Sequence, residues 1–267
     1  GLRDRWKGIV SLYAFCKVNQ LQYYIDYTFP FDLKKLTIPN QYNWIIAPTD
    51  ICHNIRNVHM MRLAGDSTLK RMQKLPTTKQ IHCYANRDWL PIINQTYHTQ
   101  LDWGELFNEL FKPSPYLEQC LKEKRVSLPS IYIAVAFRMQ NLLGDYPEYQ
   151  YTPASPNRQK EILDACKTYI LHLQKRTQKN ILITSDSERL TKEFENLTGI
   201  YINTGSAAHV DTNSNAPLEQ YCKSFIDFYL LSEAEEIYSV GTKEMYDSDF
   251  PRYAAKLNNR PFERIVL

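Results

Sequence analysis

An uninterrupted apolar run at residues 131–137 ends abruptly on Arg138. A run without polar alternation predicts a strand buried on both faces. Strand and helix patterns then alternate to the end of the chain. The expected strands cover 131–137, 180–184, 200–202, 236–240 and 264–267, and the expected helices cover 158–174, a helix capped by Ser187, 218–231 and 250–257. This alternation predicts a doubly wound, largely parallel sheet.

The front half has a weaker pattern. Apolar side chains at helical spacing predict an amphipathic helix over 5–17. A strand is expected at 22–27, weaker strands at 44–47 and 80–84, and a helix at 101–111, whereas 113–129 is interpreted as an interdomain connection with one short charged helix. We therefore expect two domains, 1–125 and 126–267. A doubly wound domain starts on a strand, so we also expect a strand to precede Gly1.

Composition excludes several classes of protein. The 32 basic and 29 acidic residues leave a net charge of +3, which gives no reason to expect nucleic acid binding. The six cysteines contain no C-x-x-C pair, which favours a reduced protein without zinc over a disulfide framework. No stretch approaches the roughly 20 apolar residues that span a bilayer. We expect a cytoplasmic location, with peripheral association at the inner face of a membrane left open.

Polar residues follow the predicted strands of the second half. Arg138 ends the first strand, and its guanidinium offers a rigid fork of donors suited to phosphate. Asp186 follows the next strand and could accept from a ribose hydroxyl or a guanine N–H. Ser239 and Thr242 end a third strand, and Ser248 precedes the helix that starts near Phe250, where free N–H groups would form an anion site. Parallel topology would bring these strand ends to one edge, where ligands bind in open α/β sheets.

Simpler interpretations remain open for each position. Arg138 could pair with a carboxylate, and Asp186 or Ser187 could cap a helix. Asp247 and Asp249 form a D-x-D triplet, a pattern that can bind a divalent metal bridging a nucleotide diphosphate, but acidic residues in front of a helix are also favoured by its dipole. His209, in a loop, could contact a bound sugar or only solvent.

Several segments resemble inverting fucosyltransferases of the α1,2, α1,6 and protein O-fucosyl group, which includes the nodulation fucosyltransferases. The opening residues 1–17 are similar to that group's glycine-rich loop and first helix. Residues 133–138 look like its H-x-R motif, 181–186 resemble its strand ending A-T-D, and 248–250 are similar to its S-x-F-S helix start. The likeness covers most of 130–267 and about the first 20 residues.

The resemblance implies an α/β GT-B fold, in which two Rossmann-like domains enclose a cleft. Residues 1–125 would form the acceptor-side domain and 126–267 the nucleotide-sugar-binding domain. It also implies a GDP-sugar donor, most simply GDP-fucose, no metal or other cofactor, and a role in polysaccharide biosynthesis. The acceptor would be a glycan or a lipid-linked oligosaccharide.

The resemblance also implies roles for particular residues. Arg138 would bind the donor diphosphate and Asp186 the nucleotide. The phosphates would also be contacted by Ser239, Thr242, Ser248, the N–H groups near Phe250, and Gly1 and Arg3 of the front loop. An inverting transfer needs a base for the acceptor hydroxyl, and the candidates are Asp145, which we take as the catalytic residue, Asp4 and Asp26; alternatively, the leaving diphosphate serves in place of a side chain. The sugar-facing residues expected in the front half are Tyr23, Tyr24, Trp44, Arg56, Trp89 and Trp103.

Departures from the family pattern leave the donor sugar open. The motif histidine is Ala136, the residue after Arg138 is Met139, and Pro251 replaces the second serine of S-x-F-S. Two alternative functions therefore remain open. One is a non-catalytic α/β protein that binds a glycan or a nucleotide, and the other is a metal-dependent transferase using Asp247 and Asp249.

Overall fold

The computed structural model describes the chain except residues 64–67, 77–78, 147–151 and 212–214. It divides into two compact units, Gly1–Pro113 and Ser114–Leu267. The domain boundary expected from the sequence, at 125/126, falls inside helix α5 (Pro115–Ser127) of the second unit. This helix begins where the Ser114 hydroxyl accepts from the Leu117 N–H, and it buries Leu117 and Leu121.

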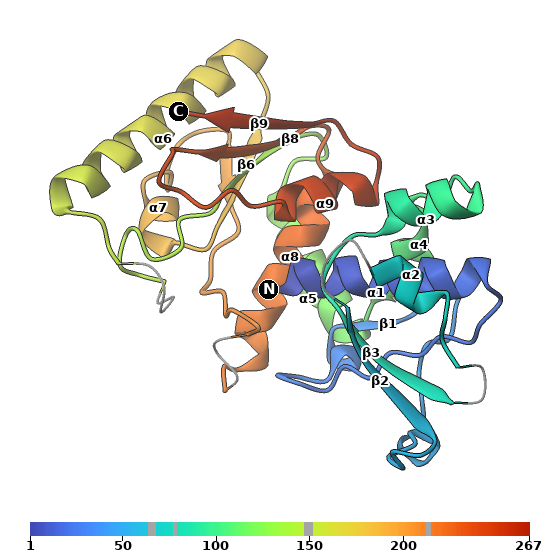
Figure 1. The fold of residues 1–267 in the computed structure, drawn as a ribbon. Coiled ribbons are helices and arrows are strands. Elements are labelled where there is room, and N and C mark those ends of the chain that lie inside the picture. Colours follow the sequence, from blue (N-terminus) through green and yellow to red (C-terminus); the bar gives the residue numbers. More distant parts are fainter. Residues whose placement is uncertain (64–67, 77–78, 147–151, 212–214) are drawn as a thin grey trace. The chain divides into compact units, whose positions relative to one another are not determined.

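The second unit is built on a five-stranded parallel sheet (Figure 1). Its strand order is β7 (Ile200–Ile202), β6 (Ile181–Ser185), β5 (Ile133–Phe137), β8 (Ile237–Gly241) and β9 (Phe262–Val266). β5, the middle strand, and its neighbour β6 are buried along their whole length, as their apolar runs predict. The predicted parallel sheet is thereby confirmed.

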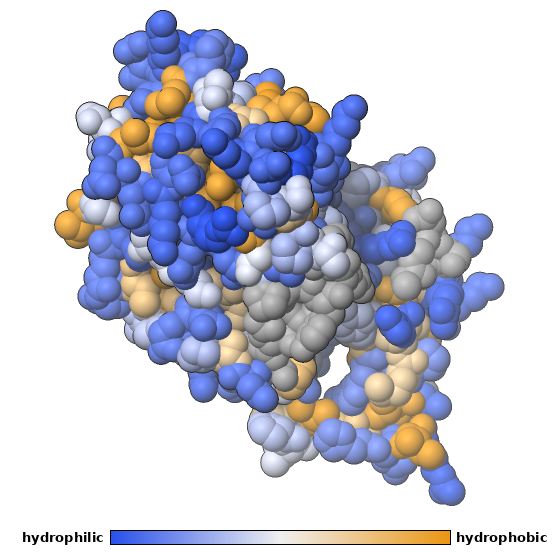
Figure 2. Space-filling view, turned by 90° about the vertical axis from the view of Figure 1, so that its left-hand side faces the viewer, coloured by the Kyte–Doolittle hydropathy of each residue, from blue (hydrophilic) through white to orange (hydrophobic). Residues whose placement is uncertain are grey.

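Helices cover both faces of this sheet (Figure 1). α6 (Pro156–Thr177) and α7 (Glu188–Lys192) contribute to one core cluster with alternate residues of β5, β6 and β8. α8 (Leu218–Glu233) and α9 (Phe250–Leu257) pack together on the other face, where the Tyr132 hydroxyl donates to the Leu230 carbonyl. The buried side chains of α6 recur every three or four residues, and the opposite side meets solvent. Figure 2 shows the side of the molecule on which α6 lies, where hydrophilic residues predominate and hydrophobic ones are scattered.

The first unit combines helices with two small sheets. β2 (Val58–Leu63) pairs in parallel with β3 (Gln80–Ala85), and β1 (Thr37–Pro39) pairs antiparallel with β4 (Phe111–Pro113). The helices are α1 (Leu2–Val18), α2 (Thr68–Met72), α3 (Leu90–Tyr97) and α4 (Trp103–Leu110), with short 3-10 turns at Leu33–Lys35 and Pro48–Asp50. The aromatic core centres on Phe107, whose ring lies 5.2–5.3 Å from those of Trp6 and Trp103.

Two strands expected in the first unit are wrong. Residues 22–27 and 44–47 are not assigned to strands, although the Ile25 N–H donates to the Trp44 carbonyl at 2.9 Å. A single backbone hydrogen bond of this kind does not pair two segments as strands of a sheet. Conversely, β1, β2, β4 and α3 were not expected. Within the described residues, no helix has both the length and the apolar character that crossing a bilayer requires.

Candidate functional site at the carboxyl edge of the second sheet

Arg138 and Asp186 meet at the carboxyl ends of the adjacent strands β5 and β6. Phe137 and Ser185 are in register, so the residues that follow them are neighbours. The Arg138 Nη1 donates to Asp186 Oδ2 at 2.7 Å. The Asp186 side chain is 5% exposed and that of Arg138 is 23% exposed. The arginine therefore faces the edge, and the aspartate lies beneath it.

Asp186 also holds the loop that follows Arg138. Its two carboxylate oxygens accept from the backbone N–H groups of Met139 and Gln140, each at 2.8 Å. Gln140 is buried and has a left-handed φ of 51°, a conformation that non-glycine residues adopt only when their surroundings impose it. The same carboxylate thus fixes the guanidinium and the turn that carries it. Both the expected edge position of Asp186 and the simpler interpretation, in which Arg138 pairs with a carboxylate, agree with this geometry.

Tyr146 completes the surroundings of the guanidinium. Its ring lies 4.9 Å below the Arg138 Cζ, a cation–π distance. The Tyr146 ring and the Asp186 carboxylate together hold the planar guanidinium of Arg138 in one orientation. A fixed, partly exposed guanidinium at a parallel-sheet edge is suited to bind an anionic oxygen group.

Asp145 is tied to the start of α7. Its Oδ2 accepts from the Ser187 hydroxyl and from the Arg189 N–H, both at 2.8 Å. Ser187 in turn accepts from the Leu190 N–H at 3.1 Å, which confirms its predicted capping role. The Oδ1 atom of Asp145 is buried and has no hydrogen-bond partner among the described residues.

A buried ionic network, not expected from the sequence, supports the end of β6. The Lys223 Nζ donates to Asp227 Oδ2 at 2.6 Å and to the Ser185 carbonyl at 3.3 Å. Asn203, which follows β7, donates to Asp227 Oδ1 at 2.7 Å. Burial raises the pKa of Asp227, and the Lys223 charge opposes that rise. The signal that could have found this network is the i, i+4 lysine–aspartate pair within an apolar stretch of α8.

The other residues of the second unit that were predicted to bind the nucleotide-sugar donor lie toward β8 and β9. Ser239 stands between Ala136 and Arg264 in the strand register. The Thr242 N–H donates to the Met245 sulfur, and the Ser248 hydroxyl accepts from the Phe250 N–H at 3.3 Å. The Arg264 guanidinium donates to the Ser248 carbonyl at 2.9 Å. Ser248 and Phe250 are therefore joined to β9 rather than to Arg138.

The D-x-D aspartates both pair with arginines. Asp247 forms an ion pair with Arg264, and Asp249 lies 3.5 Å from Arg252. The described residues contain no cluster of three histidines, cysteines, aspartates or glutamates that could hold a metal ion. In the loop after β7, the Asp211 N–H donates to His209 Nδ1 at 3.3 Å, a local contact within a turn.

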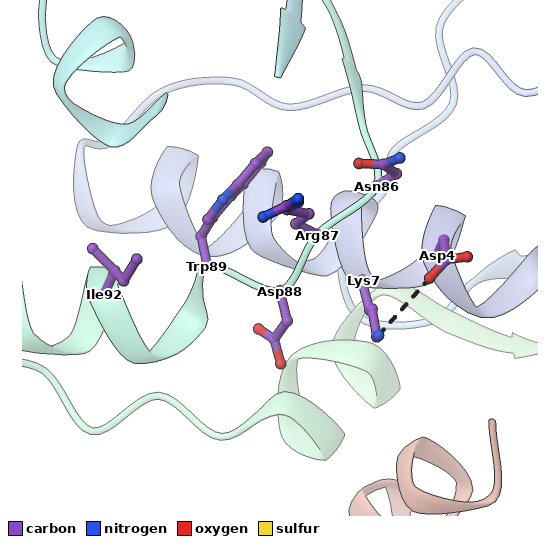
Figure 3. A pocket seen from close by; sticks show the side chains of 7 residues that line it. All are labelled: Asp4, Lys7, Asn86, Arg87, Asp88, Trp89 and Ile92. Atoms are coloured by element: carbon purple, nitrogen blue, oxygen red, sulfur yellow. Dashed lines mark ion pairs between the residues drawn. The ribbon is translucent and has the colours of Figure 1, made fainter. Parts of the chain in front are cut away.

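The two predicted residues of the front loop begin α1 in the first unit. Gly1 is its N-cap residue, and Arg3 donates to Asp4 Oδ1 from both Nε, at 3.0 Å, and Nη2, at 2.7 Å. Several aromatic residues expected to face a sugar are instead core residues. Trp44, Trp89, Trp103 and Tyr23 are buried, because the first unit uses them for packing, whereas Tyr24 and Arg56 are exposed. The first unit contains a cavity of about 480 Å³ beside Asp88, where α1, α3 and the segment after β3 meet (Figure 3). For Trp44, Trp103 and Tyr23, which do not line this cavity, the expected sugar-facing position is wrong, whereas the buried Trp89 does line it.

Comparison with known proteins finds similarity in structure only. No protein-family model matches the chain. No curated protein matches it either. A mutant of FUT1 from Arabidopsis thaliana in complex with GDP superposes with a TM-score of 0.64 at 12% identity, covering 99% of this chain and 68% of that one. NodZ α-1,6-fucosyltransferase co-crystallized with GDP gives 0.54 at 11% identity, covering 95% and 88%, and NodZ soaked with GDP-fucose gives 0.54 at 11%, covering 96% and 89%.

These neighbours establish the fold. The chain is a mixed α/β protein with a parallel sheet and has the GT-B fold of these fucosyltransferases, as expected from the sequence. At such low identity the likeness shows the architecture, and activity must be argued from the site.

Proposed function

We propose that this chain is a glycosyltransferase that moves fucose from GDP-fucose to a glycan acceptor, with inversion and without a metal ion. The observation that carries the proposal is the guanidinium of Arg138, held by Asp186 at the carboxyl edge of a parallel sheet. The fold supports it, because solved structures with this fold contain GDP or were soaked with GDP-fucose.

In the proposed reaction the acceptor hydroxyl oxygen attacks C1 of the donor sugar from the face opposite the diphosphate. The bond from C1 to the phosphate oxygen breaks, and GDP leaves with the electron pair. Arg138 stabilises the negative charge that grows on the departing diphosphate. Loss of one such donor costs about 3–4 kcal/mol of barrier, or two to three decades in rate.

The remaining donor contacts are assigned by position. Ser239, Thr242, Ser248 and the N–H groups near Phe250 would bind the phosphates from the β8 side. Asp186 would act on the nucleotide indirectly, because its oxygens already accept from Arg138, Met139 and Gln140. We infer that it is a positioning residue for the arginine.

The acceptor proton needs a base. Asp145 is the proposed one: its Oδ2 accepts from Ser187 and Arg189, and its Oδ1 has no partner among the described residues. The proton would pass from the acceptor hydroxyl to this carboxylate as the new bond forms.

The proposal also includes a cytoplasmic location and an acceptor that is a glycan or a lipid-linked oligosaccharide.

The test is calorimetric titration with GDP, and with UDP for comparison, on the wild-type chain and on Arg138→Ala. We expect GDP to bind the wild type, UDP to give no signal, and the variant to lose most of the affinity. Arg158→Ala is the matched control, since Arg158 pairs with Glu161 and Glu244 on an exposed surface of the same unit. Absence of GDP binding to the wild type would overturn the proposal and leave a non-catalytic binding protein as the better description.

A further inference from the structure

The end of β6 is held by cations from two different elements. Arg138, which follows β5, donates to the Asp186 carboxylate at 2.7 Å. The Nζ of Lys223 in α8 donates to the carbonyl oxygen of Ser185 at 3.3 Å. Ser185 and Asp186 are consecutive residues, so a displacement of the Ser185 carbonyl also moves the backbone that carries the Asp186 side chain.

Lys223 is in turn fixed by contacts that link α8 to β7. Its Nζ donates to Asp227 Oδ2 at 2.6 Å, one helical turn further along α8. The amide of Asn203, which follows β7, donates to Asp227 Oδ1 at 2.7 Å. Polar contacts therefore run across the carboxyl ends of β7, β6 and β5, from Asn203 to Arg138.

The pair of charges on α8 lies inside the protein. The Lys223 side chain is 5% exposed and that of Asp227 is 10% exposed. Desolvation makes a buried ion pair costly, and apolar residues of similar volume usually stabilise a fold as well or better. Stability alone therefore gives no reason for these charges, whereas the contact of Lys223 with Ser185 gives them a use at the candidate site.

We infer that Lys223 is a positioning residue for Arg138. It fixes the Ser185 carbonyl, and thereby the Asp186 carboxylate that holds both the guanidinium and the Met139 N–H. A lysine suits this role, because its ammonium offers three donors and can serve a carboxylate and a carbonyl from different elements. The inference deepens the proposed function and rests on it, since Arg138 is the residue proposed to bind the diphosphate.

The first measurement follows the Met139 N–H, which donates to Asp186 Oδ1 at 2.8 Å. The chain has 5 methionines, so labelling methionine with nitrogen-15 gives a simple NMR spectrum, in which Met139→Leu and Met245→Leu assign two signals. In Lys223→Leu we expect the Met139 N–H to exchange with deuterium about 10-fold faster than in the wild type. Met245, whose N–H donates to the Thr242 carbonyl after β8, is the internal reference and should be unchanged.

The second measurement is calorimetric titration with GDP. We expect the affinity of Lys223→Leu to fall by about 10-fold, a loss typical of residues that orient a ligand-binding group. The double variant Lys223→Leu, Asp227→Asn removes both buried charges, so it provides the test if the single variant does not fold, and it should show both changes. Asp227→Asn alone leaves the Lys223 contact with Ser185 in place and should retain the wild-type exchange and affinity.

Arg125→Leu is the matched control for a loss of stability. Arg125 of α5 also forms an ion pair with α8, but with Glu233 at the end of that helix, at 2.5 Å. Its substitution should lower the melting temperature and leave both the exchange of the Met139 N–H and the affinity for GDP unchanged. A merely structural role of Lys223 would give the same result as this control.

The inference is overturned if a folded Lys223 variant keeps the wild-type exchange of Met139, or binds GDP as tightly as a wild type that does bind it. It is also overturned if Asp227→Asn alone reproduces the full effect. The two claims fail separately. GDP binding that depends on Arg138 but not on Lys223 sinks this inference alone. Faster exchange of Met139 in Lys223→Leu, with no GDP binding by the wild type, sinks the proposed function and leaves Lys223 as the residue that positions Arg138.

Discussion

The Arg138 guanidinium and the Asp186 carboxylate form a 2.7 Å ion pair across the ends of β5 and β6, and the same carboxylate binds the two N–H groups after Arg138. One buried group thus orients both the side chain and its loop. This arrangement resembles the pairing of a ligand-binding group with a second residue that holds it in place.

Substitution of the two partners should separate binding from positioning. We expect Arg138→Ala to lower GDP affinity by about 10–100-fold with little change in thermal stability. Asp186→Ala should weaken GDP binding and also destabilise the fold by about 1–3 kcal/mol, because buried N–H groups lose their acceptor. Calorimetry and thermal melting measure both effects. Unchanged GDP affinity in Asp186→Ala would refute the positioning role.

Asp145→Asn tests the proposed base. If Asp145 takes the acceptor proton, turnover should fall by about 10²–10⁴-fold while GDP affinity is retained. Ser187→Ala is the control, because it removes one hydrogen bond that Asp145 accepts while leaving the carboxylate in place. Equal losses of turnover and of melting temperature in the two variants would show that Asp145 acts only through the start of α7.

Transfer from GDP-fucose should continue in the presence of a chelator. Asp247 and Asp249 are each paired with an arginine, which disfavours a divalent cation at the same oxygens. The double variant Asp247→Asn, Asp249→Asn should therefore keep its turnover. Initial rates with EDTA and after addition of manganese provide the measurement. Activity that depends strictly on manganese would support the metal-dependent alternative instead.

The Cys166 thiol should resist alkylation in the folded protein. Burial raises its pKa to about 12, whereas a free cysteine has a pKa of about 8.5. At pH 8.5 roughly half of the unfolded thiols are thiolates, against on the order of one in 3,000 in the fold. Mass spectrometry of iodoacetamide-treated protein, with and without urea, follows the peptide, and Cys166→Ser confirms its assignment. Equal rates in both states would contradict the burial.

The raised pKa of Cys166 also makes the stability of the fold depend on pH. The folded state keeps the thiol proton where the unfolded state has released it, so the contribution of Cys166 to the free energy of unfolding is fully present below pH 8.5. It is lost as the pH rises toward the folded pKa of about 12. Denaturant titrations should accordingly show that the wild type loses more stability than Cys166→Ser between pH 8 and 10.

Gly8→Ala should destabilise the first unit. The new Cβ would stand 1.9 Å from the Ala85 carbonyl oxygen and 2.9 Å from the Ala85 Cβ, so helix and strand must separate. Overpacking of this kind costs about 1–3 kcal/mol. Gly241→Ala is the control, because its Cβ would meet the Met245 Cβ at 3.3 Å, a contact that a shift of a few tenths of an ångström relieves. Thermal melting of both variants checks the difference, and equal melting temperatures would contradict the close contact.

Local sequence pattern was sufficient for the elements of the second unit. The apolar runs of β5 and β6 and the stripe of α6 carry their own periodicity, so their positions followed from the residues alone. The strand-end position of Arg138 and Asp186 followed in the same way. The sequence left open whether Arg138 pairs with a carboxylate but did not name Asp186 as the partner, and only the register of β5 and β6 brings the two residues together.

Tertiary structure decided what depends on a distant partner. β1 and β4 pair Thr37 with Pro113 and Pro39 with Phe111, and no local pattern reveals such a match. Residues 22–27 have a strand composition but lack a neighbouring ladder, and composition by itself does not supply the hydrogen bonds. The cavity beside Asp88 and the Lys223–Asp227–Asn203 network likewise join segments far apart in the chain. Sequence determined the elements with their own periodicity, whereas the contacts between them arose only when folding brought their surfaces together.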